Sequence, residues 1–171
     1  MSNDKSDQRM VNLYSSDGRS LKISRKASRQ STWLNNLLLE SNFDNKSFFA
    51  SVFSYFFPII VDKVHSEVLE KVIEWCEHHK DDPVWVDEPN ADVSKFDVQF
   101  MNVDKSGHFD ILMAAYYLQI EPLQTLAAKS FANMLKGKSV EELRLFLSIK
   151  NDFTPEEKEE IQRQNAWLED A

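Results

Sequence analysis

The sequence contains few of the residues on which disulfides, metal clusters and phosphate-binding loops depend. Of its 171 residues, one is a cysteine and three are glycines. A single cysteine excludes an intramolecular disulfide and zinc or iron–sulfur sites that need several cysteines. No G-x-G-x-x-G, G-x-S-x-G or H-E-x-x-H motif occurs. We therefore expect a protein that is not an enzyme and has no cofactor, catalytic residue or metal site.

Positive charge and long apolar runs are also scarce. Lys and Arg number 20 against 28 Asp and Glu, and the resulting net charge of -8 repels a phosphate backbone. The longest stretch without charge, residues 47–61, is shorter than the ~20 residues of a membrane-spanning helix. The N-terminus lacks the apolar core of a signal peptide. We therefore expect no nucleic-acid or membrane partner, a disordered segment at residues 1–9, and a location in the cytoplasm and nucleus.

The single cysteine suggests two kinds of chemistry, and neither is favoured. A metal could be held by Cys76, His78, His79 and Asp82, but His78 points about 100° away from the helix face that Cys76 and His79 share. Polar residues at a helix end explain this group better. As a nucleophile, Cys76 would need a base and a cleft, yet it lies in line with Leu69 on an apolar face. A buried structural thiol is the favoured interpretation.

A short basic stretch stands out against the acidic background. It contains Arg19, Lys22, Arg25, Lys26 and Arg29 without an intervening acid. No aromatic residues interleave with these charges, as single-strand binding would require. A solvated face, or a surface for an acidic protein, is favoured over nucleic-acid binding.

Glycines and helix caps divide the first half of the chain. Asp17 and Gly18 separate two alternating segments, residues 10–14 and 20–24, and this pattern predicts a β-hairpin. Apolar periodicity predicts a helix over residues 28–40. A second helix is predicted to start with Ser66 as its N-cap.

The middle of the chain combines loop signals with helical ones. Two prolines and five acids between residues 81 and 92 predict a solvated loop. An extended segment over residues 100–103 and a loop containing Gly107 follow. Helices are then predicted over residues 110–118 and 122–136, and Gly137 stands where a helix C′ residue belongs.

The last third carries two capping boxes and a thinly apolar helix. Ser139 with Glu142, and Thr154 with Glu157, have the spacing of reciprocal N-terminal caps. The helix over residues 155–168 has only three large apolar side chains, namely Ile161, Trp167 and Leu168. Since most helix stability comes from tertiary burial, a partner chain could supply what this helix lacks.

One segment, residues 48–57, is unusually rich in phenylalanine and tyrosine. Such density either fills part of the core or forms an exposed surface for a partner or for self-association. The sequence leaves both interpretations open.

Several ordered motifs resemble the S-phase-kinase-associated adaptor family, whose members link F-box proteins to a cullin scaffold in multisubunit ubiquitin ligases. The motifs are K-V-I-E-W-C-E-H-H-K-D-D-P at residues 71–83, F-D-V-Q-F at 96–100, A-A-Y-Y-L-Q-I at 114–120, A-N-M-L-K-G-K at 132–138 and I-K-N-D-F-T at 149–154. The resemblance implies an α/β (α+β) fold: a BTB/POZ-type core over residues 10–120, with an acidic loop at about 81–95, and a helical F-box-binding extension over 121–171.

The resemblance also implies two binding surfaces. The implied F-box contacts are Phe131, Met134, Leu135, Ile149, Phe153, Ile161 and Trp167. The implied contacts with the cullin N-terminal domain are Leu112, Tyr116 and Tyr117. The F-box face could also form a homodimer.

The chain departs from the family pattern at several motifs. Tyr116 replaces the asparagine of A-A-N-Y-L, the W-D-x-x-F motif begins with Phe96, and the phenylalanine-rich segment replaces a short acidic loop. We therefore expect an SCF-type adaptor that is a diverged paralogue. The alternative is a BTB-type self-associating structural or regulatory protein that has lost cullin binding.

Overall fold

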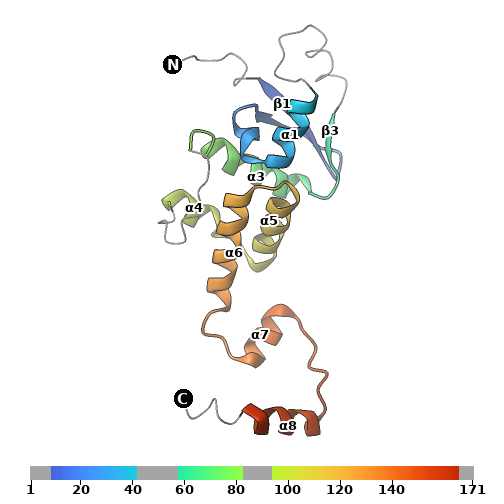
Figure 1. Ribbon diagram of the computed structural model, residues 1–171, viewed down its shortest axis with the longest axis vertical. Helices are drawn as coiled ribbons and strands as arrows, with labels where there is room; N and C mark the ends of the chain where they lie inside the picture. Colours follow the sequence, from blue (N-terminus) through green and yellow to red (C-terminus); the bar gives the residue numbers. More distant parts are fainter. Residues whose placement is uncertain (1–8, 42–57, 83–93, 166–171) are drawn as a thin grey trace. The chain divides into compact units, whose positions relative to one another are not determined.

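The computed structural model describes residues 9–41, 58–82 and 94–165. Its elements are β1 (Met10–Ser15), β2 (Ser20–Ser24), the 3-10 turn η1 (Ala27–Gln30), α1 (Thr32–Glu40), β3 (Ile59–Val61), α3 (Ser66–His78), α4 (Lys95–Phe100), α5 (Lys105–Tyr117), α6 (Glu121–Leu135), α7 (Val140–Leu147) and α8 (Pro155–Asn165). This mixture of a small sheet and helices confirms the predicted fold class (Figure 1). The phenylalanine-rich segment, most of the acidic loop, residues 1–8 and Trp167 lie outside the described residues.

A three-stranded sheet in the order β2-β1-β3 opens the fold. β1 and β2 form the predicted antiparallel hairpin, in which Leu13 pairs with Leu21. Gly18 supplies the turn with a φ of +79°, which residues with a side chain rarely adopt. β3 runs parallel to β1, with Ile59 opposite Leu13.

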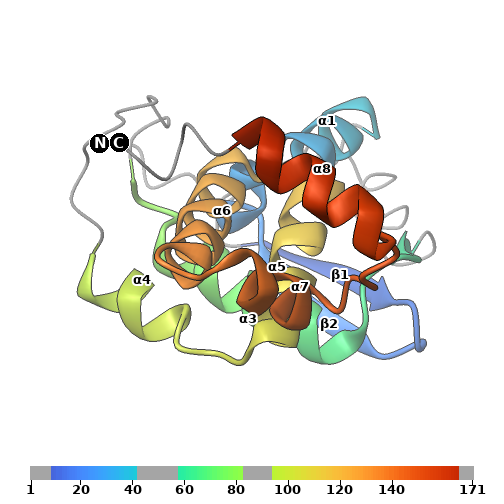
Figure 2. The same cartoon turned by 90° about the horizontal axis from the view of Figure 1, so that it is seen from below.

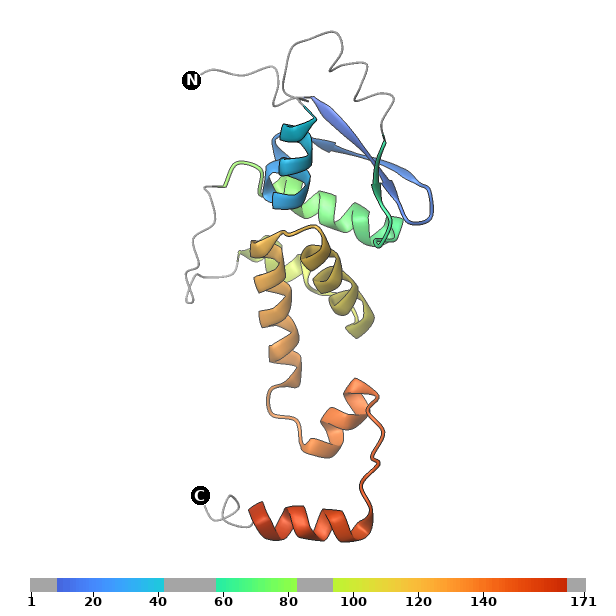
Figure 3. The same cartoon turned by 45° about the vertical axis from the view of Figure 1, so that its right-hand side comes forward.

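Helices cover one side of this sheet and bury the core. Figure 3 shows α1 and α3 on the same side of the sheet, with α5 and α6 beyond them. α3 contacts β1, β2, η1 and α5. The core includes buried apolar side chains from β1, α1, α3, α5 and α6, namely Leu13, Leu34, Leu69, Ile111 and Leu123. Burying each such side chain contributes about 1.5–3 kcal/mol.

The start of α3 differs from the prediction. His65, not Ser66, is the N-cap, and it makes no side-chain cap hydrogen bond. Instead the Ser66 hydroxyl and backbone N–H both donate to the Asp17 carboxylate, at 2.8 and 3.0 Å. Hydrogen bonds from the Ser15 and Ser66 side chains hold the pKa of Asp17 well below its usual range. The hairpin turn is thereby tied to the first turn of α3.

The predicted helix over residues 28–40 is interrupted at Ser31, which has extended backbone angles. Its hydroxyl caps α1 by accepting from the Leu34 N–H at 3.0 Å, and it donates to the Leu118 carbonyl. A long-range contact with the end of α5 therefore divides the segment into η1 and α1.

Two middle elements also differ from the prediction. Phe100, predicted to be extended, ends the helix α4, which Figure 2 shows on the side of the unit away from the β1–β2 hairpin. α5 begins at Lys105 rather than at residue 110, because the Asp104 carboxylate caps it by accepting from the Gly107 N–H at 3.0 Å. Gly107 lies inside the first turn, where a Cβ would come within 2.9 Å of Asp104 Oδ1.

The chain divides into two compact units after Met134. α6 belongs to the first unit up to Met134, because it buries Leu123 and Ala127 in the core of that unit. The domain boundary predicted at residue 120 stays a prediction. In the second unit the capping box of Ser139 and Glu142 is confirmed, as is that of Thr154 and Glu157. The second unit contains α7 and α8, and neither helix contributes a buried residue. No helix among the described residues is long and apolar enough to cross a membrane.

Candidate protein-interaction surfaces

The first candidate surface is the exposed face of α5. Phe109, Met113 and Tyr116 recur at helical spacing and are all exposed, with Tyr116 retaining 65% of its accessible area. Leu112, which was predicted to belong to this surface, is partly buried against the core. α5 thus presents an aromatic and aliphatic stripe while its other face fixes it to the core.

Tyr117 is held in one orientation by its neighbours. Its hydroxyl donates to Asp62 Oδ1 at 2.7 Å, the Lys63 ammonium lies 5.5 Å from its ring centroid, and the Trp33 ring lies at 5.9 Å. The hydrogen bond to Asp62 raises the pKa of Tyr117. The phenol is therefore protonated and pre-oriented at neutral pH. Sequence reasoning missed Asp62 because it is 55 residues away from its partner.

A small hollow lies beside the two tyrosines. Its volume is about 340 Å³, and its lining residues are Thr32, Tyr116, Tyr117, Gln119, Glu121 and Gln124. The Gln119 backbone has a positive φ of 53°, and its carbonyl accepts from the Thr32 N–H at 3.2 Å. The surface around Tyr116 is therefore a ring beside a polar recess, which a single partner side chain could enter.

The second candidate surface is in the second unit. Four residues predicted to contact an F-box belong to it: Leu135 is half-buried, whereas Ile149, Phe153 and Ile161 are exposed. The Arg144 guanidinium lies 5.4 Å from the Phe153 ring centroid. The predicted contacts Phe131 and Met134 belong to the first unit and are half-buried.

The structure adds exposed apolar residues that sequence reasoning missed. Leu145 is 81% exposed and Val140 is 58% exposed, both on α7. Val140 and Leu145 are five positions apart and therefore lie on different faces of the helix. Apolar periodicity therefore gave no signal for them. For a unit this small, such exposure is typical of a surface that a partner covers.

The residues considered for metal or thiol chemistry have structural roles. Cys76 is buried, and burial raises the pKa of its thiol to about 12, so the nucleophilic thiolate is absent at neutral pH. His79 is hydrogen-bonded to Asp82 at 2.5 Å and to Asp97 at 3.1 Å, and His78 stacks on Phe96. Among the residues that the structure describes, no group of three His, Cys, Asp or Glu side chains could hold a metal ion.

The basic stretch is not a uniformly solvated face. Arg25 is fully buried and donates to Asn35 Oδ1 at 3.0 Å, so its predicted place on a solvated face is wrong. Lys26 pairs with Asp81, and Arg19 pairs with Glu70 at 3.4 Å. These contacts connect the segment with α3 and the residues after it.

Comparisons with known proteins cover nearly the whole chain. The tetramerisation domain of the Skp1 family, a POZ domain, matches residues 9–81, and the dimerisation domain of that family matches residues 121–168. A Skp1-related protein of Caenorhabditis elegans is 38% identical over 95% of this chain and 93% of its own length. The chain belongs to the Skp1 family. This confirms the resemblance that the sequence motifs indicated.

Other Skp1-family relatives carry a functional description. Proteins named E3 ubiquitin ligase complex SCF subunit sconC, from Arthroderma benhamiae and Talaromyces marneffei, are each 39% identical over 94% of this chain. The alignments cover 95% and 97% of those proteins. The family's POZ domain accounts for the sheet, η1, α1 and α3, and its dimerisation domain accounts for α6 to α8.

Proposed function

We propose that this Skp1-family protein is a non-catalytic adaptor subunit of an SCF-type E3 ubiquitin ligase. It bridges F-box substrate receptors to the N-terminal domain of a cullin scaffold. The observation that carries the proposal is the second unit, whose helices bury no residue while apolar side chains such as Leu145 and Phe153 stay exposed. Relatives that align over almost their full length are named as SCF subunits.

The F-box surface is proposed to lie on the second unit, which begins at Leu135, the last residue of α6. Phe131 and Met134, in the first unit, stay predicted contacts. A helix such as α8, with only Ile161 among its described residues as a large apolar side chain, gains little from its own unit. Aromatic and large aliphatic side chains dominate the energetics of protein interfaces. A partner that covers Ile161, Phe153 and Leu145 would supply the burial that α7 and α8 lack. Trp167 lies outside the described residues and stays a predicted contact.

The cullin surface is proposed to be the exposed stripe of α5. Tyr117 offers a pre-oriented ring and Tyr116 an exposed one, and the core beneath them holds both in place. Rigid aromatic side chains contribute large contact area with little loss of conformational entropy on binding. The proposed cullin surface is on the first unit, and most of the proposed F-box contacts are on the second. The proposed location is the cytoplasm and nucleus.

The F-box half of the proposal is tested by calorimetry with an F-box domain. Truncating an interface anchor costs roughly 2 kcal/mol, so Ile161→Ala and Trp167→Ala should each weaken binding at least about tenfold. Ile161→Ala should leave the thermal midpoint unchanged, since Ile161 is exposed in the free protein. Gln162→Ala, on the same helix, is the matched control. Unchanged affinity in both anchor variants would contradict the assignment of this face.

A second candidate function rests on the same exposed apolar residues. A surface that suits an F-box could also join two copies of this chain, giving a homodimer through the F-box face. A self-associating structural protein would form dimers in sedimentation experiments and bind no cullin domain. If the protein is an adaptor, adding an F-box domain should convert any homodimer into a 1:1 complex of this chain with the F-box domain.

A further inference from the structure

Three residues from outside α5 converge on Tyr117. Asp62 and Lys63 follow β3, and Trp33 lies on α1. The Lys63 ammonium lies over the Tyr117 ring, and the Trp33 ring lies beside it. The hydrogen bond from the Tyr117 hydroxyl to Asp62 Oδ1, at 2.7 Å, is the most directional of these contacts, because its strength depends on both distance and angle. Asp62 therefore fixes the position of the hydroxyl end of this half-buried side chain.

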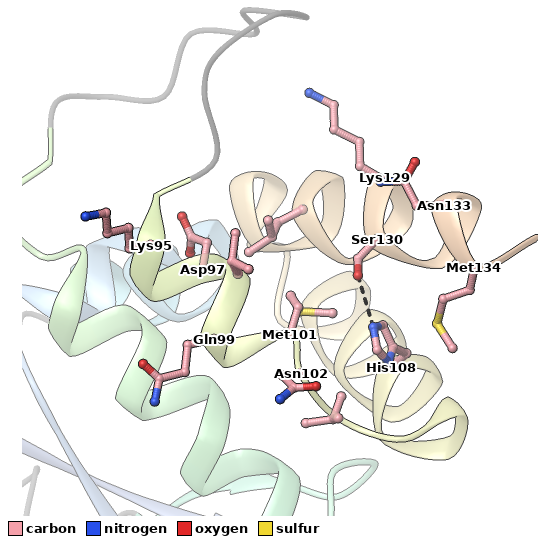
Figure 4. Close-up of a pocket in the computed structure, with 13 residues that line it drawn as sticks. Lys95, Asp97, Gln99, Met101, Asn102, His108, Lys129, Ser130, Asn133 and Met134 are labelled. Atoms are coloured by element: carbon pink, nitrogen blue, oxygen red, sulfur yellow. Dashed lines mark hydrogen bonds between the residues drawn. The ribbon is translucent and has the colours of Figure 1, made fainter. Parts of the chain in front are cut away.

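The backbone of α5 is anchored independently of this hydrogen bond. Near the start of α5, the buried His108 ring is hydrogen-bonded to the Ser130 hydroxyl of α6 at 3.0 Å, as Figure 4 shows. At the C-cap of α5, the Leu118 carbonyl accepts from the Ser31 hydroxyl. Removing the Asp62 carboxylate should therefore free the tyrosine side chain without moving the helix that carries it.

The freedom of the Tyr117 side chain affects how tightly a partner can bind to it. An aromatic side chain on a helix has two favoured χ1 rotamers, near 180° and −60°. The hydrogen bond to Asp62 selects one orientation before a partner arrives. Without it, the partner has to immobilise the side chain on binding, and this lowers the affinity by about three- to tenfold for one side chain.

We propose that Asp62 is a positioning residue for cullin binding. It acts through Tyr117, whose ring it holds in the orientation that the cullin domain contacts, and it does not contact the cullin domain itself. The inference rests on the proposed cullin surface of α5. It goes beyond that surface because it assigns part of the affinity to the loop after β3, which lies outside the helix that forms the stripe.

A double-mutant cycle tests whether Asp62 acts through Tyr117. The dissociation constant of the full chain for a cullin N-terminal domain that binds the wild type is measured by calorimetry. Asp62→Ala and Tyr117→Phe remove the same hydrogen bond, so each should weaken binding about three- to tenfold. The double variant should bind within about twofold of Tyr117→Phe, because the bond can be lost only once. Asp62→Asn, whose amide oxygen can still accept from the hydroxyl, should retain most of the affinity.

The titration of Tyr117 in the free protein measures the contact without a partner. Asp62 raises the pKa of Tyr117, so in Asp62→Ala this pKa should fall toward its ordinary value of about 10. NMR of ¹³C-labelled tyrosine rings as a function of pH measures the change. Glu74→Ala removes the same charge from an exposed position on α3 and is the matched control. It should change the cullin affinity less than about twofold and leave the pKa of Tyr117 unchanged.

Three results would overturn this inference and leave the adaptor function intact. One is that Asp62→Ala binds the cullin domain as tightly as the wild type. Another is that the losses from Asp62→Ala and Tyr117→Phe add in the double variant, which would show that Asp62 contacts the partner directly. The third is an unchanged pKa of Tyr117 in Asp62→Ala. If the wild type binds no cullin domain of a panel, the proposed function fails, and this inference fails with it.

Discussion

Single side chains in this protein hold distant segments together and shape the proposed binding surfaces. Asp62 reaches Tyr117 from the loop after β3, and Glu77 on α3 accepts from the Ser24 N–H and hydroxyl at 2.6 and 3.0 Å. Both contacts link residues more than fifty positions apart. Substituting one of these residues therefore tests one long-range contact by itself.

The two tyrosines of α5 should differ in their effect on cullin binding. Tyr117→Lys removes a pre-oriented ring next to Lys63 and is expected to abolish binding to cullin N-terminal domains in a pull-down panel. Tyr116→Asn replaces an exposed ring by the family's small amide and is expected to change which cullin is preferred. Wild type should bind at least one cullin domain. If none of the three proteins binds any, the self-associating alternative is supported instead.

The Glu77 carboxylate should make stability depend on pH. Partial burial alone would raise the pKa of Glu77, but the hydrogen bonds from Ser24 outweigh it and lower that pKa. A lowered pKa in the folded state adds stability that is full above the ordinary value near 4.3 and is lost as the pH falls through the folded value. Glu77→Gln should therefore reduce the unfolding free energy at pH 7 by about 1 kcal/mol, measured by denaturant titration.

The same titration at lower pH provides the decisive comparison for Glu77. The difference between wild type and Glu77→Gln should shrink as the pH is lowered toward the folded-state pKa. Glu74→Gln, on the exposed face of α3, should show no comparable loss at pH 7. A difference that is independent of pH would contradict the role of the ionised carboxylate.

Cys76 should be inert in the folded protein. Its burial and raised pKa predict that a thiol reagent such as iodoacetamide reacts with it only after unfolding, at a rate that follows the opening of the core. Mass spectrometry of alkylated protein with and without denaturant measures this. Rapid alkylation of the native protein at pH 8 would show that the thiol is accessible.

Among the elements, those with local signals were predicted well and those fixed by distant contacts were not. The Gly18 hairpin and both C-terminal capping boxes depend on neighbouring residues, and all three were predicted. The start of α3 was mispredicted because Asp17, far along the chain, engages Ser66. The predicted start of α5 was too late, because Gly107 was interpreted as a loop residue. In the structure Gly107 lies in the first helical turn, where a Cβ would come 2.9 Å from Asp104 Oδ1.

α8 should be the element that responds most to a partner. Because it buries no side chain, its amides should exchange rapidly with solvent in the free protein. Adding an F-box domain should protect them, since binding supplies the missing burial. Hydrogen exchange with mass spectrometry measures both states, and α3, which lies in the core, is the internal reference. Strong protection of α8 in the free protein would show that it packs within its own chain.

At the scale of the whole molecule, local sequence patterns were more informative than the contacts between distant segments. Periodicity and capping predicted a last helix with few large apolar side chains. Family motifs indicated the two tyrosines of α5 as cullin contacts. The hydrogen bond between His108 on α5 and Ser130 on α6 could not be predicted, because these residues are 22 positions apart and meet only in the folded unit. The division after Met134 was likewise set by tertiary burial of the first half of α6.

The central claim is that this chain joins two partners at once. The most direct measurement immobilises an F-box domain, adds a cullin N-terminal domain with or without this protein, and follows binding by interferometry. We expect the cullin signal only when this protein is present, with its loss for Tyr117→Lys and its weakening for Trp167→Ala. Cullin binding that never depends on this protein, across a panel of cullin domains, would contradict the adaptor function.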